Sequence, residues 1–135
     1  MAQKVVHTEA EWRELLTPEQ YKVLREKDTE RPWSGEYCSI HAAGTYRCAA
    51  CKSPLFESGT KFESGSGWPS FFQPLSDDAV YIERDMSHGM IREEALCSTC
   101  DSHLGHVFND GPPPTFRRWC INSLSLELDT GDGES

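Results

Sequence analysis

Residues 117–123 place one cysteine, Cys120, between groups that can alter the reactivity of a thiol. Polar and apolar residues alternate from there to Leu128, a pattern that predicts a half-buried strand. Because successive side chains of a strand point to opposite faces, Arg118, Cys120 and Asn122 should share one face. A thiol beside a cation and an amide could act as a nucleophile. A lone cysteine on a strand is more often a small core residue, so the other cysteines must decide between the two interpretations.

The chain contains six cysteines, and four of them form two pairs with CxxC spacing. A CxxC turn places two sulfur atoms on one side of a tight loop, so two such turns can supply the four ligands of a tetrahedral Zn²⁺ ion. Disulfides would need an oxidising compartment, and a redox CxxC motif fits poorly with two copies flanked by strands. The sequence therefore predicts one structural zinc ion, bound by Cys48, Cys51, Cys97 and Cys100.

When these four ligands are set aside, Cys38 is the only cysteine left beside Cys120. Cys38 ends a segment in which Pro32 and Gly35 disfavour regular structure. We therefore expect Cys38 to lie on a loop, where it can move.

Three other residues are candidates for binding or proton transfer. Trp68 lies in a stretch rich in glycine and serine, where an indole ring serves either as a core residue or as a platform for a ligand. His103 and His106 follow the second CxxC pair closely. They could bind the metal, but four thiolates already satisfy zinc, so we expect them to tune or transfer protons near Cys120.

Composition excludes several classes of partner. The formal net charge of −9 over 135 residues argues against nucleic acids and anionic membrane surfaces, which attract basic proteins. No apolar run is long enough to cross a membrane, and the N-terminal residues lack the apolar segment of a secretory signal. We expect a soluble, monomeric protein of the reducing cytoplasm.

Helix signals are confined to residues 8–27. Thr8 and Thr17 each begin a capping box, and Pro18 occupies the first helical position after Thr17. The sequence predicts two short helices that form an N-terminal arm, whose apolar residues dock on the rest of the domain.

The remaining pattern is typical of a mainly β protein. Residues 44–47 predict a strand that leads into the first CxxC pair, and residues 79–86 and 90–96 predict a hairpin. No repeat or linker interrupts the chain, so we expect one domain over residues 1–135 that ends in a disordered tail at 129–135.

Taken together, these segments resemble the B-type peptide methionine-R-sulfoxide reductases. The resemblance covers nearly the whole chain, and its motifs occur in a fixed order: ERPWSGEY, GTYRCAAC, SGSGWPSF, SHGM, CSTCDSHLGHVF, DGPPPT and RWCINS. It implies two antiparallel sheets clipped by one structural zinc ion, and an enzyme that reduces methionine-R-sulfoxide in proteins or peptides.

The resemblance also implies roles for individual residues. It places the catalytic nucleophile at Cys120. It further indicates catalytic roles for His103, His106, Asn122 and Arg118, and substrate binding by Trp68 and Phe108. Attack on the sulfoxide would leave methionine and a sulfenic acid on Cys120.

One departure from the family pattern concerns the recycling of that sulfenic acid. Many relatives carry a resolving cysteine where this chain has Ser66, and a serine hydroxyl cannot form a disulfide. We therefore expect Cys38 to resolve the sulfenic acid as a disulfide with Cys120, which a thioredoxin-type dithiol would then reduce. A smaller departure is Phe116, where relatives usually have glycine.

Two other functions are compatible with parts of the sequence. A zinc-clipped binding module would need the four paired cysteines and Trp68, but it would not need Cys120 with Arg118 and Asn122 on its face. A reductase of free methionine sulfoxide alone would share every motif, so the width of the substrate site stays open.

Overall fold

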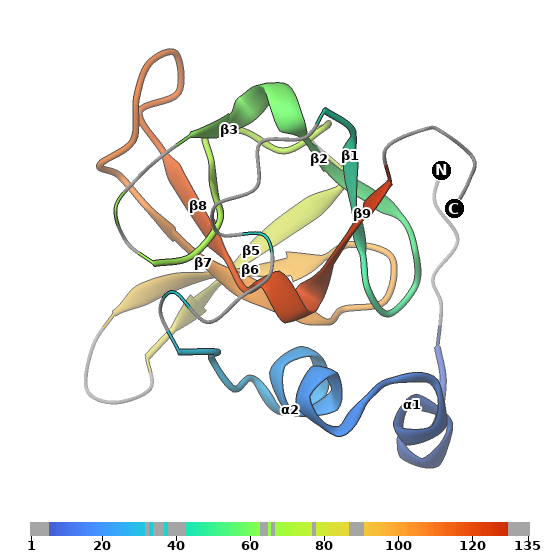
Figure 1. The fold of residues 1–135 in the computed structure, drawn as a ribbon. Helices are drawn as coiled ribbons and strands as arrows, with labels where there is room; N and C mark the ends of the chain where they lie inside the picture. The colour runs from blue at the N-terminus through green and yellow to red at the C-terminus, as the bar shows by residue number, and fades with distance from the viewer. Residues whose placement is uncertain are drawn as a thin grey trace.

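Two antiparallel sheets of unequal size and two short helices form this protein (Figure 1). The computed structural model describes residues 6–31, 33, 37, 43–62, 65, 67–76, 78–86 and 91–129. In chain order the elements are α1 (Glu9–Leu15), α2 (Pro18–Glu26), β1 (Thr45–Cys48), β2 (Pro54–Glu57), β3 (Lys61–Phe62), β4 (Ser70–Phe71), β5 (Val80–Asp85), β6 (Arg92–Cys97), β7 (His103–Phe108), β8 (Arg118–Ile121) and β9 (Leu126–Asp129), with 3₁₀ turns at Ser58–Thr60 and Ser123–Ser125.

The smaller sheet has the strand order β2-β1-β9, and the larger has the order β3-β4-β8-β7-β6-β5. All the strand pairs are antiparallel. The predicted hairpin is present, because β5 pairs with β6 from Val80 opposite Cys97 to Asp85 opposite Arg92. The prediction of a mainly β fold with two antiparallel sheets is confirmed.

A core of aromatic side chains joins the two sheets. Phe56 of β2 stacks on Phe71 of β4 with ring centroids 4.3 Å apart, and Tyr46 of β1 meets the same Phe71 ring edge-on. All three side chains are fully buried. Burial of such large apolar groups is the main force that holds sheet against sheet.

The helical arm has the predicted caps. Thr8 and Glu11 complete one capping box, and Thr17 and Gln20 complete the other. The α2 helix packs on β7 and on the turn that follows β8, and α1 lies beside it (Figure 1). Within the described ranges, no helix has the length and apolar character needed to cross a bilayer.

The predicted C-terminal strand is wrong in one respect, because it is two strands in two sheets. The chain leaves the larger sheet after β8, turns through Ser123–Ser125, and enters the smaller sheet as β9. The turn is held by Ser125, whose Oγ donates to the carbonyl of His103 at 3.1 Å. Strand β8 is buried over Trp119–Ile121, and only β9 alternates between buried and more exposed residues.

The structure also differs from the sequence-based expectations at the C-terminal tail and at one additional strand. Asp129 belongs to β9, where it pairs with Thr45 and bonds Arg47, so it is not part of a tail. Residues 130–135 lie outside the described residues. Strand β7, which the sequence did not predict as an element, lies inside the larger sheet between β6 and β8.

Phe116 adopts a backbone conformation that suits glycine. Its φ is 59°, and its side chain is 60% exposed in the loop before β8. A side chain with a Cβ destabilises this left-handed conformation, while an exposed ring recovers little by packing. This is the position where the resembled family usually has glycine.

We predict that Phe116→Gly stabilises the protein by about 0.5–1 kcal/mol, since relief of the left-handed strain outweighs the added freedom of the unfolded chain. Denaturant unfolding measures the change. Phe116→Ala is the control, because it removes the ring but keeps the Cβ. Equal stability changes in the two variants would show that the ring, and not the backbone, is responsible.

Candidate active site and metal centre

Cys120 lies in the interior of the larger sheet. Its strand β8 is bordered by β4 and β7, so Cys120 faces Ser70 on one side and His106 on the other. The side chain of Cys120 is buried, with 9% of its surface exposed. Strand pairing on both sides therefore fixes the backbone that carries the thiol.

The thiol opens into a cavity of about 240 Å³. Cavities that take drug-sized ligands are larger, at about 300–1,000 Å³, so this one suits a single side chain. Arg118, Cys120 and Asn122 all line it, as expected for alternate residues that begin in one strand. The remaining lining residues are Thr29, Trp68, Arg92, Gly105, His106 and Phe108.

Arg118 is the cation nearest in sequence to the thiol, and its own position is fixed. Its guanidinium makes two bonds to the Asp110 carboxylate, at 2.9 and 3.2 Å, and lies 4.5 Å from the centre of the Phe108 ring. The hydrogen bonds of Asp110, followed by the charge of Cys120, raise the pKa of Arg118. The same attraction favours the thiolate form of Cys120.

Each histidine is held by a carboxylate. Nε2 of His106 lies 2.9 Å from Asp85, and Nδ1 of His103 lies 2.7 Å from Glu94. Burial lowers the pKa of His106 despite its carboxylate partner, so its neutral form dominates at pH 7. The two imidazole rings meet edge-on with centroids 5.5 Å apart.

The two histidines differ in their access to the cavity. His106 is half-buried and lines the cavity with Cys120, whereas His103 is almost fully buried and lines a neighbouring cavity that His106 also borders. The site thus has an inner and an outer histidine. Neither one is grouped with the clustered cysteines.

The amide of Asn122 is committed to the protein. Its Nδ2 donates to the carbonyl of Leu104 at 3.0 Å, and its Oδ1 accepts the backbone N–H of Glu30 at the same distance. Asn122 therefore ties β7 and the segment after α2 to the end of β8. Its side chain fixes the wall of the cavity.

The sequence pattern did not identify several residues that surround the cavity. Asp85 and Glu94 hold the histidines, and Thr29, Arg92 and Glu30 lie on or next to the cavity wall. The one available signal was the presence of charged residues at inward positions of the predicted hairpin.

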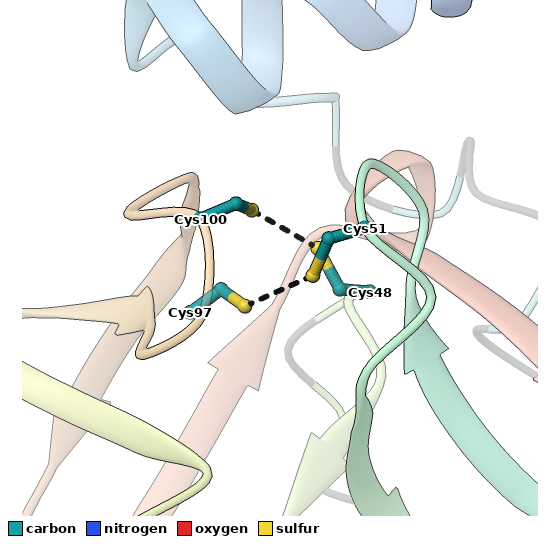
Figure 2. Close-up of side chains that lie close together, drawn as sticks. All are labelled: Cys48, Cys51, Cys97 and Cys100. Atoms are coloured by element: carbon teal, nitrogen blue, oxygen red, sulfur yellow. Dashed lines mark hydrogen bonds between the residues drawn. The ribbon is translucent and has the colours of Figure 1, made fainter. Parts of the chain in front are cut away.

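The four paired cysteines form a cluster, shown in Figure 2. Their sulfur atoms lie within 4.8 Å of one another, and two of the pairs, Cys48 with Cys100 and Cys51 with Cys97, are 3.7 and 3.6 Å apart. A tetrahedron with metal–sulfur bonds of about 2.3 Å has sulfur–sulfur edges of about 3.8 Å. The cluster therefore has the dimensions of a tetrahedral metal site, and none of the four thiols is in a disulfide.

The two CxxC turns have matching backbones. Cys48 accepts a bond from the N–H of Lys52, and Cys97 accepts the equivalent bond from Asp101, both at 2.8 Å. Lys52 and Asp101 each adopt a positive φ, of 69° and 63°. One turn follows β1 of the smaller sheet and the other follows β6 of the larger, so a bound metal would link the two sheets.

Two residues of the predicted chemistry, Cys38 and Ser66, lie outside the described residues. Tyr37, which precedes Cys38, is described. Its backbone N–H donates to Oγ of Ser123 at 3.1 Å, and its hydroxyl accepts the N–H of Leu128. Tyr37 therefore lies beside the turn that directly follows the Cys120 strand.

The site thus combines a thiol beside a cation with a carboxylate-held histidine, and each of the two sheets carries two cysteines of a four-cysteine cluster, an arrangement typical of a thiol-dependent enzyme. Comparisons with known proteins agree with this class. The model of the SelR domain family matches residues 16–130.

Similar curated proteins carry one name, "Peptide methionine sulfoxide reductase MsrB". The protein of Pseudomonas putida (strain W619) is 58% identical over 131 residues, which cover 97% of this chain and 98% of that protein. The protein of Thiobacillus denitrificans (strain ATCC 25259 / T1) is 60% identical, with coverage of 93% and 95%, and that of Bradyrhizobium diazoefficiens is 61% identical, with coverage of 93% and 91%. This chain belongs to the B-type peptide methionine sulfoxide reductases, as the motifs indicated.

We predict that loss of the metal destabilises the whole fold. Cys97→Ser should lose the bound metal, and its Tm should fall by about 10 °C or more, because metal binding contributes folding free energy directly. Metal content and thermal unfolding measure both effects. Cys120→Ser is the matched control, since it removes a thiol outside the cluster and should leave metal content unchanged. A metal-free Cys97→Ser variant with unchanged Tm would contradict the structural role.

Proposed function

We propose that this chain reduces methionine-R-sulfoxide in proteins or peptides to methionine, with Cys120 as the nucleophile. The observation that carries the proposal is that one small cavity brings together Cys120, Arg118, Trp68 and His106. The proposal also follows the family to which the chain belongs. A binding module would not need a thiol with a cation beside it at the floor of this cavity.

In the first step, the thiolate of Cys120 attacks the sulfur atom of the sulfoxide. The sulfoxide oxygen takes up a proton and passes to the cysteine sulfur, which leaves methionine and a Cys120 sulfenic acid. Arg118 favours the attacking thiolate. Trp68 and Phe108 offer aromatic surfaces to the methyl group of the substrate, opposite the polar side that receives the oxygen.

His106 is the better candidate for the acid that protonates the oxygen. His106 lines the same cavity as Cys120, whereas His103 lines the neighbouring cavity. Asp85 holds Nε2 of His106, which sets the orientation of the ring. Burial lowers the pKa of His106, so its protonated form is the minor one at pH 7, and this form would give its proton to the sulfoxide oxygen. His103 and Asn122 then serve to position the cavity wall.

The metal of the four-cysteine cluster is proposed to be zinc. Four thiolates in a tetrahedron are the ligand set that structural zinc prefers, and such a site leaves no open position for a substrate. The ion would act on stability and not on the reaction.

Recycling is proposed to run through Cys38. The thiol of Cys38 condenses with the Cys120 sulfenic acid, which forms a disulfide and releases water. A thioredoxin-type dithiol then reduces that disulfide and is itself oxidised to a disulfide. The anchoring of Tyr37 on Ser123 supports this route, because Cys38 is bonded directly to Tyr37. We also propose that the chain works as a single monomeric domain in the reducing cytoplasm.

The first experiment compares the R and S sulfoxides of a blocked methionine, with a small dithiol as the reductant. We expect turnover of the R epimer alone, and a loss of at least about a thousandfold in Cys120→Ser, because the reaction has no other nucleophile. Turnover of both epimers would contradict the role of Trp68 in stereochemistry. Turnover of neither by folded, metal-loaded protein would favour the binding module.

Cys38→Ser tests the recycling step. With thioredoxin as the reductant, we expect steady-state turnover to fall by about tenfold or more, because the sulfenic acid would lack its resolving thiol. With a small dithiol, which reduces the sulfenic acid directly, turnover should change little. The double variant Cys38→Ser/Ser66→Cys returns the thiol to the position used by many relatives, and it should recover activity with thioredoxin. Undiminished thioredoxin-driven turnover in Cys38→Ser would exclude this role.

A further inference from the structure

Glu30 is a buried carboxyl group that the proposed reaction does not use. It lies in the segment that follows α2, outside any helix or strand, and its exposed fraction is 8%. Its backbone N–H, its carbonyl and its side chain each bond to a distant part of the chain. A carboxyl group with this set of partners calls for a structural or functional reason.

Two of these bonds hold residues of the Cys120 cavity. The backbone N–H of Glu30 donates to Oδ1 of Asn122 at 3.0 Å, and its carbonyl accepts the indole N–H of Trp68 at 3.0 Å. Asn122 and Trp68 come from different segments, and both line the cavity. The backbone of residue 30 therefore fixes the position of Trp68 relative to Asn122, on two walls of the cavity.

The side chain fixes residue 30 itself. Oε1 of Glu30 accepts the N–H of Leu124 at 2.9 Å, within the turn that follows β8. Because no helix or strand holds residue 30, this bond is the one link to the Cys120 strand that depends on the identity of the side chain. Loss of the bond would leave Trp68 and Asn122 tied to a segment that is free to shift.

Trp68 needs such an anchor, because the segment before it contains two glycines. It lies between β3 and β4, next to Gly65 and Gly67, whose φ angles are 72° and 93°. Glycine allows these conformations without strain, but it also allows many others. The indole N–H is the only hydrogen-bonding group of the Trp68 side chain, and it is used on Glu30.

The stability of the fold alone does not explain the buried carboxyl group of Glu30. Oε2 of Glu30 is buried and has no hydrogen-bond partner among the described residues. Burial of a carboxyl oxygen without a hydrogen-bond partner destabilises a fold, and an apolar side chain of similar shape would remove that oxygen. The position of the carboxyl group, and not its contribution to folding, is then the reason for its presence.

We propose that Glu30 is a positioning residue that holds Trp68 and Asn122 in place for the sulfoxide. It acts through these two residues and does not itself touch the substrate. The inference rests on the proposed reductase function. A second bond from the same segment agrees with it: Lys27 donates to Glu94 at 3.3 Å, and Glu94 holds His103.

The test compares Glu30→Met with Glu26→Met, which makes the same change on the exposed end of α2. In Glu30→Met we expect KM for the blocked R sulfoxide to rise about tenfold, with kcat within about twofold, because a displaced Trp68 weakens ground-state and transition-state binding alike. The Tm should stay within about 3 °C of that of the unmodified protein, because the lost bond to Leu124 and the removal of an unsatisfied oxygen act in opposite directions. Glu30→Gln keeps an oxygen for Leu124 and should restore KM to within about threefold of its original value.

A spectroscopic measurement separates this inference from the proposed function. The indole N–H resonance of Trp68, assigned by its absence in Trp68→Phe, should move in Glu30→Met and stay in place in Glu26→Met. If the unmodified protein showed no reductase turnover, the proposed function would fail and this resonance would still decide whether Glu30 positions Trp68. An unmoved resonance, or a loss of Tm that accompanies the loss of activity, would overturn the positioning role.

Discussion

The four-cysteine cluster is the constraint on which the arrangement of the two sheets depends. One CxxC turn extends from the smaller sheet and the other from the larger, so closing the cluster fixes one sheet against the other. Each turn also holds a segment of the site. The N–H of Ala49, inside the first turn, donates to the carbonyl of Ser125 at 2.9 Å, and Arg25 of α2 donates to the carbonyl of Cys100 at 2.8 Å.

These two contacts connect the cluster to the chemistry. Ser125 belongs to the turn in which β8 ends, directly after the Cys120 strand. Arg25 lies near the end of α2, which leads into the segment that carries Glu30. A metal ion bound by the four cysteines would therefore hold both supports of the cavity without taking part in the reaction.

The sequence was informative wherever one local rule decides the outcome. Cysteine spacing predicted the cluster, the threonine capping boxes predicted both helix starts, and alternation predicted that Arg118 and Cys120 share a face. It failed where non-local bonds decide. The break at Ser123–Ser125 depends on a bond from Ser125 to His103, and the role of Glu30 depends on partners more than thirty residues away. No local pattern distinguishes these residues from ordinary serines and glutamates.

Buried polar atoms without hydrogen-bond partners occur both in the core and around the cavity. Among the described residues they are Nε1 of Trp12 and the hydroxyl of Tyr46 in the core, and Oε2 of Glu30, Nε of Arg92 and Nε2 of His103 around the cavity. Such atoms reduce stability, so a protein can keep them only if its remaining contacts tolerate the loss. The stacked aromatic core and the four-cysteine cluster join the two sheets, and they supply this reserve of stability. Because the reserve lies outside the cavity, polar groups at the cavity can be placed for the sulfoxide instead of for the fold.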